Sequence, residues 1–273
     1  DEKRPKSGLL RGREFRMKDL YSFHASSSDR DLYYEIMRKA YLKIFGRLGL
    51  EVIETKASGG TFSELSQEFQ VIAKTGEDTI YYCPKCKAGV NKEVYLGKEK
   101  CLQCEGELKE GLAVEVGNIF PLKRKFAEDF NLKFKDKNGE DKLVEAGCYG
   151  LGTSRLMGTM VEVFSDDKGI IWPESVAPFG IHLIGLDGKN DEVRSRTEKV
   201  YQKLLDGGIK VLYDDRDSSA GEKFADADLI GIPWRLVVSE KTGDKIELKS
   251  RSSEDVKLVR TEELIKKLNG HTR

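Results

Sequence analysis

The chain has 273 residues, 38% of them hydrophobic, so it is long enough for two domains that each bury a core of ordinary size. Its 47 basic and 47 acidic side chains cancel, so any contact with nucleic acid must depend on local patches rather than on a global field. No apolar run approaches the roughly 18 residues of a membrane span, and the opening residues show no signal-peptide pattern. We therefore expect a cytoplasmic protein with no membrane partner.

The first 19 residues, DEKRPKSGLLRGREFRMKD, are unusually rich in charge. They read as two extended pieces around a loop of Lys, Arg, Pro and Gly. Chain ends are usually frayed and carry no such pattern, so the stretch raises the question of whether it belongs to a site rather than to a tail.

A sheet-rich half follows, with an amphipathic helix predicted at 26–49. Ser or Asp supplies its N-cap, and Gly49 stands near its end. The apolar stripe that we expect to face the core is Leu32, Ile36, Ala40, Ile44 and Leu48. Segments with strand character, predicting a largely antiparallel sheet, are 14–24, 50–58, 68–75, 78–83, 111–120 and 131–136. A second helix is predicted at 154–164.

Four of the five cysteines form two Cys-x-x-Cys pairs with fourteen residues between them: Cys83, Cys86, Cys101 and Cys104. Two such knuckles can close around one tetrahedral Zn²⁺, and the alternatives are two disulfides or four free thiols. A cytoplasmic location disfavours disulfides. Four protein ligands leave no open position for a substrate, so the zinc would be structural, stabilising a small zinc-ribbon-like insertion at 81–110.

The stretch GCYGLGTSRLMGTM places Gly147, Gly150 and Gly152 just before the second helix, whose first turn carries Arg155. Backbone without Cβ atoms can lie flat beneath a planar ligand, and an Arg at a helix start presents a fork to phosphate oxygens. The spacing is neither that of a Rossmann turn nor that of a P-loop. By itself, the pattern fits a tight turn with a surface Arg equally well.

The character changes after the Pro-rich step at 173–178, which we take as a domain boundary. Strand segments then alternate with helical ones, which is the rhythm of an open α/β sheet. The expected strands are 181–186, 210–215, 235–241 and 245–250, and the expected helices are 191–208, 219–231 and 261–270.

The opening stretch resembles the second signature motif of the class II aminoacyl-tRNA synthetases, and GLGTSR resembles the third. Arg11, Phe15 and Asp19 fit the second strand of the second motif, and Glu2 fits the glutamate of its first strand. Within this class, the sequence of the chain most resembles those of prolyl-tRNA synthetases. The stretches that carry this similarity, from one end of the chain nearly to the other, include LLRGREF, GEDTI, EVGNIF, GCYGLG, DDKGIIWP and VLYDDRD.

This resemblance implies a partial class II catalytic domain at 1–175, an antiparallel sheet backed by helices, and an α/β anticodon-binding domain at 178–273. It implies that proline and ATP give prolyl-adenylate, and that the prolyl group then passes to the 3′ end of tRNA(Pro). The implied cofactors are ATP and Mg²⁺, beside the structural Zn²⁺. The implied partners are L-proline and tRNA(Pro), with a homodimer for the full-length enzyme.

The resemblance also assigns roles to single residues. Arg11 and Arg155 would be catalytic cations on ATP, although Arg11 could also be a solvated loop charge. The full ATP-facing set is Glu2, Arg11, Gly12, Thr61, Gly150, Gly152 and Arg155. The proline-facing set is Gly59, Gly60, Ser63, Glu68 and Cys148, of which Cys148 could equally be a small buried hydrophobe. The RNA-facing candidates are Arg216 and Lys223, for which solvated charges are the equally weighted alternative.

Departures from the family pattern limit these expectations. After EVGNIF the chain reads PLKRKFA, so Lys123 and Arg124 replace a small pair and form either an RNA-facing patch or a solvated turn. The arginine expected two residues before Glu2 would precede Asp1, and the first class II motif is not found. We therefore expect a C-terminal portion of a prolyl-tRNA synthetase that is impaired in activating proline. The alternatives are a threonyl- or glycyl-type synthetase, or a non-catalytic synthetase-like protein that binds tRNA.

Overall fold

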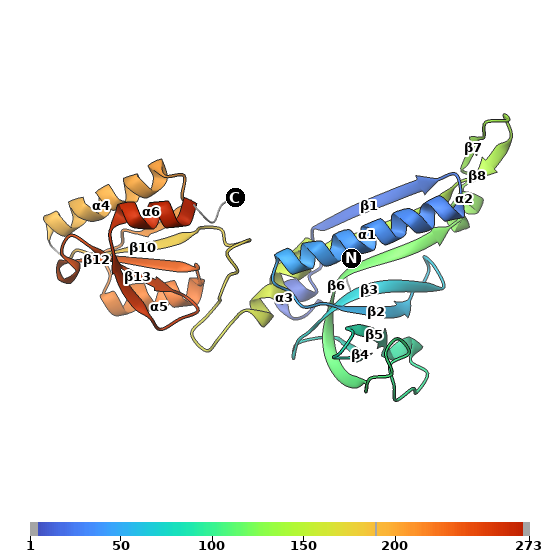
Figure 1. Cartoon of the computed structure of the whole chain (residues 1–273), viewed down its shortest axis with the longest axis horizontal. Coiled ribbons are helices and arrows are strands. Elements are labelled where there is room, and N and C mark those ends of the chain that lie inside the picture. The colour runs from blue at the N-terminus through green and yellow to red at the C-terminus, as the bar shows by residue number, and fades with distance from the viewer. Residues whose placement is uncertain (1–4, 189, 270–273) are drawn as a thin grey trace. The chain divides into compact units, whose positions relative to one another are not determined.

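The structure of the chain, a computed structural model, describes residues 5–188 and 190–269 (Figure 1). It divides into two compact units, 1–163 and 164–273, and each is described by itself. This division falls earlier in the chain than the boundary at 173–178 that the sequence suggested, because residues 164–177 pack within the second unit. In the part of the chain that the structure describes, no helix is both long and apolar enough to cross a bilayer.

The first unit is built on a seven-stranded sheet with the order β1-β9-β6-β3-β2-β5-β4. Its pairs are antiparallel apart from β2 and β5, which confirms the expected antiparallel sheet. A further pairing of β4 with the first half of β6 closes a ring of strands around Ile53, Ile80 and Ala113. The strands are β1 (Met17–His24), β2 (Ile53–Ser58), β3 (Leu65–Ile72), β4 (Asp78–Tyr82), β5 (Ala88–Asn91), β6 (Lys109–Lys123) and β9 (Glu145–Gly152).

Helices and a hairpin surround this sheet (Figure 1). The helical elements are η1 (Gly8–Leu10), α1 (Ser27–Arg47), η2 (Lys92–Val94), α2 (Lys125–Asp129) and α3 (Thr153–Val163). The hairpin of β7 (Lys133–Lys135) and β8 (Asp141–Leu143) forms its own two-stranded sheet beyond α2. The helix α1 lies along one face of the sheet, while η1 and α3 meet where β1 begins and β9 ends.

The buried face of α1 differs from the predicted one. Tyr41 and Phe45 are fully buried and pack on Phe69 of β3, with ring centroids 5.2 and 5.4 Å from that ring. Gly117 of β6 leaves the space for both rings, because a Cβ there would lie 3.2 Å from each. The aromatic stripe buries more area than the aliphatic one and therefore faces the sheet. Members of the predicted stripe that are exposed instead are Leu32, Ile36 and Ile44.

A β-bulge in β6 shapes the opposite face of the sheet. The register between β3 and β6 pairs Glu68 with Asn118 and Gln70 with Glu115, so Val116 is the extra residue. A bulge of one residue re-aims the side chains on either side of it. Glu115 and Asn118 consequently share the face that points away from α1, and this face carries the candidate site.

The second unit is an open five-stranded sheet with the order β11-β10-β12-β13-β14. The first three strands in this order are parallel and the last two pairings are antiparallel, so the expected α/β sheet is present. Helices α4 and α6 pack on one face and α5 on the other. The elements are β10 (Ile181–Leu186), α4 (Asp191–Asp206), β11 (Val211–Asp214), α5 (Ala220–Ile230), β12 (Trp234–Ser239), η3 (Glu240–Thr242), β13 (Ile246–Ser250), β14 (Val256–Val259) and α6 (Thr261–Asn269).

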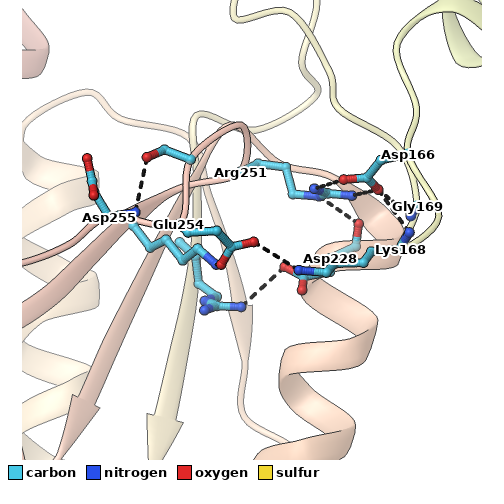
Figure 2. A network of polar contacts seen from close by, with 10 residues as sticks. Asp166, Lys168, Gly169, Asp228, Arg251, Glu254 and Asp255 are labelled. Atoms are coloured by element: carbon cyan, nitrogen blue, oxygen red, sulfur yellow. Dashed lines mark hydrogen bonds and ion pairs between the residues drawn. The ribbon is translucent and has the colours of Figure 1, made fainter.

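Residues 164–177 form a strap that is bound to the second unit (Figure 2). The guanidinium of Arg251 donates two hydrogen bonds to the Asp166 carboxylate, at 2.9 and 2.6 Å, and Lys168 pairs with Glu254 at 2.9 Å. Backbone bonds join Ile170 N to Leu229 O and Trp172 N to Gly231 O. The hydrogen bonds from Arg251 hold the pKa of Asp166 far below its usual range. The strap is thus part of this unit.

Candidate functional site

A cavity of about 340 Å³ opens on the face of the first sheet that carries the bulge. Six residues that the sequence assigned to ATP or proline line it together: Arg11, Gly12, Cys148, Gly150, Gly152 and Arg155. They come from the loop after η1, from β9 and from the first turn of α3, which are far apart in sequence. We call this space the first cavity.

Arg155 is held at the edge of the first cavity by three contacts. Its Nε donates to the Leu10 carbonyl at 2.9 Å, and its Nη1 lies 3.2 Å from both the carbonyl and the carboxylate of Glu115. Burial raises the pKa of Glu115, and the positive charge of Arg155 acts against this rise. The result is a guanidinium fixed by protein groups before any ligand arrives, which suits recognition of phosphate.

Polar side chains cluster behind this edge, on β3, β4 and β6. Gln70 donates to Glu68 at 2.8 Å and to Asp78 at 2.7 Å, and Asn118 Nδ2 lies 3.5 Å from Glu68. Burial, together with the charges of Glu115 and Asp78, raises the pKa of Glu68 to about 8. The Gln70 Oε1 and Asn118 Oδ1 oxygens are buried without a hydrogen-bond partner among the described residues. The cluster therefore contains two buried acceptor oxygens that no described group uses.

The alternation of β1 supplies cavity residues to which the sequence reasoning gave no site role. Met17, Asp19 and Tyr21 all line the first cavity, because every second side chain of a strand lies on the same face. Tyr21 donates to Asp19 at 2.9 Å, and this hydrogen bond raises the pKa of Tyr21 to about 12. Cys148 lies 3.9 Å from Asp19 in the same wall. The strand predicted at 14–24 already implied that alternate side chains share a face. That alternation could have identified these cavity residues.

The loop between β2 and β3 contributes little to the lining of the first cavity. Among the described residues, Gly59, Gly60, Thr61 and Ser63 lie outside the lining of the first cavity, to which this loop contributes Phe62. Gly59 serves the loop itself, since a Cβ there would lie 2.1 Å from the Ser63 carbonyl oxygen. Ser63 Oγ donates to the Leu65 carbonyl at 2.7 Å. Glu68 is also outside that lining but lies 3.5 Å from Asn118, which belongs to it, and Glu2 lies outside the described residues.

A second cavity of about 570 Å³ adjoins the loop and shares Phe62 with the first. Lys123 and Arg124, the pair that departs from the family pattern, line it together with Lys125 and Ser63. These cations are partly engaged: Arg124 pairs with the buried Glu145 at 2.8 Å, and Lys125 donates to the Thr61 carbonyl. Whether they also meet RNA stays a prediction.

The four paired cysteines converge on one point, because all their sulfur atoms lie within 4.8 Å of one another. The Cys83 to Cys104 and Cys86 to Cys101 sulfur distances are 3.5 Å. Zn–S bonds of about 2.3 Å place tetrahedral sulfurs about 3.8 Å apart, so the set fits Zn²⁺. The backbone N–H of Cys86 is the main cause that lowers the pKa of Cys83 to about 7, whereas the pKa of Cys86 is raised, with hydrogen bonds to the other thiols among the causes.

The two knuckles share one backbone design. Lys87 N donates to Cys83 O at 2.9 Å, and Glu105 N donates to Cys101 O at 2.8 Å. Lys87 and Glu105, each following the second cysteine of a pair, both have a positive φ, of 58 and 56°. Such a conformation is costly for residues other than glycine, so it needs compensation from the surroundings. Equal strain at matched positions is what a shared metal would stabilise.

In the second unit, one of the two RNA-facing candidates is placed differently from the prediction. Lys223 is 2% exposed, and its ammonium donates to the carbonyls of Gly185 and Asp214 at 2.9 and 3.4 Å. It joins the carboxyl ends of β10 and β11, so the prediction that it faces RNA is wrong. Arg216 is half exposed and bound to Asp214 and Asp226, at 2.7 and 2.8 Å. It keeps a solvent-facing charge.

Two family models cover nearly the whole chain. The tRNA synthetase class II core domain (G, H, P, S and T) matches residues 1–164, and the anticodon binding domain matches residues 175–271. Among curated relatives, the proline–tRNA ligase of Ehrlichia chaffeensis is 40% identical over 98% of this chain, and that of a Wolbachia from Drosophila simulans is 40% identical over 97%. The chain spans 66% and 65% of their lengths, respectively.

Solved structures agree on the fold. The prolyl-tRNA synthetase of Cryptosporidium parvum, described as complexed with L-proline and AMP, matches with a TM-score of 0.76 at 19% identity. The match covers 98% of this chain and 52% of that one. With the family models and the sequence relatives taken together, the chain belongs to the class II tRNA synthetases, and its relatives at about 40% identity in that family are proline–tRNA ligases.

Proposed function

We propose that this chain is the nucleotide-binding and tRNA-binding portion of a prolyl-tRNA synthetase, which joins proline to ATP and passes the prolyl group to tRNA(Pro). The observation that carries the proposal is the convergence of Arg11, Gly12, Gly150, Gly152 and Arg155 on one cavity. Two fixed guanidiniums and a glycine-lined strand suit a nucleotide. Further support comes from the relatives, which are named as proline–tRNA ligases.

The chemistry asks mainly for positioning. A carboxylate oxygen of proline attacks the α-phosphorus of ATP, a new P–O bond forms, and pyrophosphate leaves with the electron pair of the broken bond. Arg155 and Arg11 would orient the phosphates and offset their charge. The wall formed by Met17, Tyr21 and Cys148 is partly apolar and suits the proline ring beside the nucleotide. The proposed proline contacts of Gly59, Gly60 and Ser63 would require the β2–β3 loop to move. That of Glu68, which lies on β3, would act through Asn118.

The proposal includes two metal ions, Mg²⁺ at the nucleotide site and Zn²⁺ in the insertion. The buried acceptor oxygens of Asn118 and Gln70, next to the Glu115 carboxylate, fit a hard cation such as Mg²⁺, which prefers oxygen ligands. When bound, Mg²⁺ would neutralise phosphate charge. The cysteine set fits a structural Zn²⁺ that stabilises the insertion at 81–110, a segment with little core of its own.

Arg155→Ala tests the nucleotide site. We expect it to weaken binding of AMPPNP by about 100-fold, because it removes a fixed cation from the phosphates. Isothermal titration calorimetry on the whole chain measures this effect, and Arg47→Ala on the exposed side of α1 is the matched control. Equal affinity of the Arg155 variant and the control would contradict the proposed site.

Proline-dependent ATP–pyrophosphate exchange then tests the expectation of impaired activation, which strong exchange would overturn.

The second unit would bind the anticodon region of the tRNA, with Arg216 as the remaining candidate contact. If Arg216 neutralises one phosphate, Arg216→Gln should lower the slope of log affinity against log salt by about one. Filter binding of tRNA(Pro) across a salt series measures the slope, and Arg194→Gln on α4 serves as the control for a lost surface charge. An unchanged slope would remove Arg216 from the RNA contacts.

A further inference from the structure

A half-buried carboxylate, that of Glu77, stands directly behind one of the two cavity arginines. Arg11 Nε donates to Glu77 Oε2 at 2.6 Å, and Lys6 Nζ lies 3.4 Å from Glu77 Oε1. The Glu77 side chain is 19% exposed, whereas that of Arg11 is 36% exposed. Charge-assisted hydrogen bonds of this length are among the strong ones. The pair is therefore a fixed contact and not a loose surface ion pair.

The position of Glu77 depends on the preceding residue, Gly76. Gly76 N donates to the Ala73 carbonyl at 3.0 Å, which makes a tight turn at the start of β4. A Cβ at Gly76 would lie 2.4 Å from the backbone nitrogen of Ala113 in β6. The turn can approach β6 this closely only without a side chain. That approach carries the Glu77 carboxylate to the loop that bears Arg11.

The same loop is fixed from its other side. Lys6 N donates to the Arg11 carbonyl at 3.1 Å, so residues 6–11 close on themselves, and Arg155 Nε donates to the Leu10 carbonyl at 2.9 Å. A small cavity of about 40 Å³ lies between the two sides. Glu77 and Glu115 line it together with both arginines. Both cations therefore border this small cavity, and each is paired with its own glutamate.

We propose that Glu77 is a positioning residue for nucleotide binding, which holds Arg11 by its Nε edge so that the guanidinium is already oriented toward the first cavity. This inference rests on the proposed function, because it takes an adenine nucleotide as the ligand of Arg11. A side chain that is ordered beforehand loses less conformational freedom when the ligand binds. Glu77 itself touches no substrate in this arrangement.

Glu77 also has a competing effect on nucleotide affinity that is opposite in sign to the orienting effect. An experiment can therefore distinguish the two. Glu77 also cancels part of the charge of Arg11, and a phosphate would bind more tightly without that negative charge. Removal of the carboxylate therefore weakens binding if orientation dominates and strengthens it if charge dominates. Gln at this position keeps an acceptor oxygen for Arg11 Nε and removes the charge, so it separates the two effects.

The experiment is a titration of AMP into the whole chain, followed by calorimetry, for the variants Glu77→Ala and Glu77→Gln. We expect Glu77→Ala to weaken binding about tenfold and Glu77→Gln to recover most of that loss. Glu99→Ala, an exposed glutamate in the insertion, is the control and should bind as the unmodified chain does. Thermal unfolding of each variant tests for a purely structural role of Glu77. Such a role would lower the melting temperature, and the Gln variant would not restore it.

The outcomes separate the inference from the proposed function. If the unmodified chain binds AMP and Glu77→Ala binds it equally or more tightly, Glu77 is not a positioning residue and the nucleotide site still stands. If Glu77→Gln is as weak as Glu77→Ala, the hydrogen bond to Arg11 is not what matters and the inference is overturned. If the unmodified chain does not bind AMP, both the inference and the nucleotide site fail.

Discussion

Chain purified without chelator is expected to carry one zinc per molecule, and Cys101→Ser is expected to lose nearly all of it. Cys101 is buried and supplies one of four converging sulfurs. Structural zinc in small ribbons contributes roughly 10 kcal/mol or more to folding of the segment that holds it. Residues 83–108 should therefore become sensitive to protease in the variant. Atomic absorption measures the metal, and limited proteolysis with mass spectrometry locates the cuts.

Cys148→Ser is the matched control, because Cys148 is the fifth cysteine and lines the first cavity instead. It should retain full zinc and the original protease pattern. A chain that binds no zinc, or a Cys101→Ser variant that keeps a full equivalent, would contradict the metal assignment. Two disulfides would show the same absence of zinc, and thiol counting under denaturing conditions identifies them.

Gly231→Ala is expected to destabilise the second unit by roughly 3 kcal/mol or more. Gly231 ends α5 with a φ of 77°, and a Cβ there would lie 2.0 Å from the Ile170 carbonyl oxygen in the strap. Alanine combines a left-handed backbone with a clash against main chain that cannot rotate away. Urea denaturation followed by circular dichroism measures the loss.

Gly208→Ala separates the two contributions. Gly208 has nearly the same φ, 76°, but a Cβ there would meet no described heavy atom within 4 Å. The expected cost is about 1 kcal/mol, from the backbone conformation alone. Similar losses for the two variants would mean that the strap yields to the added methyl group, so its packing is not tight.

The sequence predicts the parts of the site that depend on spacing within one segment. The glycines of 147–152 and Arg155 are close in the chain, and the strand-to-helix turn brings Gly150, Gly152 and Arg155 to one cavity as expected. Glu77, Glu115 and Asn118 were missed because their meeting depends on how distant strands pair, including the register of β3 against β6 and its one-residue bulge. Nothing within either strand specifies that register alone.

The two wrong placements have a common physical cause. The helix α1 carries an aliphatic and an aromatic stripe, and the choice between them depends on Phe69 and Gly117 in distant strands. Lys223 is a charged residue in a polar stretch, yet two carbonyls at strand ends accept from it and offset its burial. In both cases the partner lies in another element, which a local pattern cannot contain.

The strap of residues 164–177 bears on how this protein can be divided. A fragment that starts at 178 would leave Arg251 without Asp166 and would remove the backbone partners that Ile170 and Trp172 give to Leu229 and Gly231. A fragment that starts at 164 would keep every one of these contacts. Studies of anticodon recognition with the isolated C-terminal half should therefore begin at Phe164, since the shorter piece would report the instability of a cut surface as a defect in RNA binding.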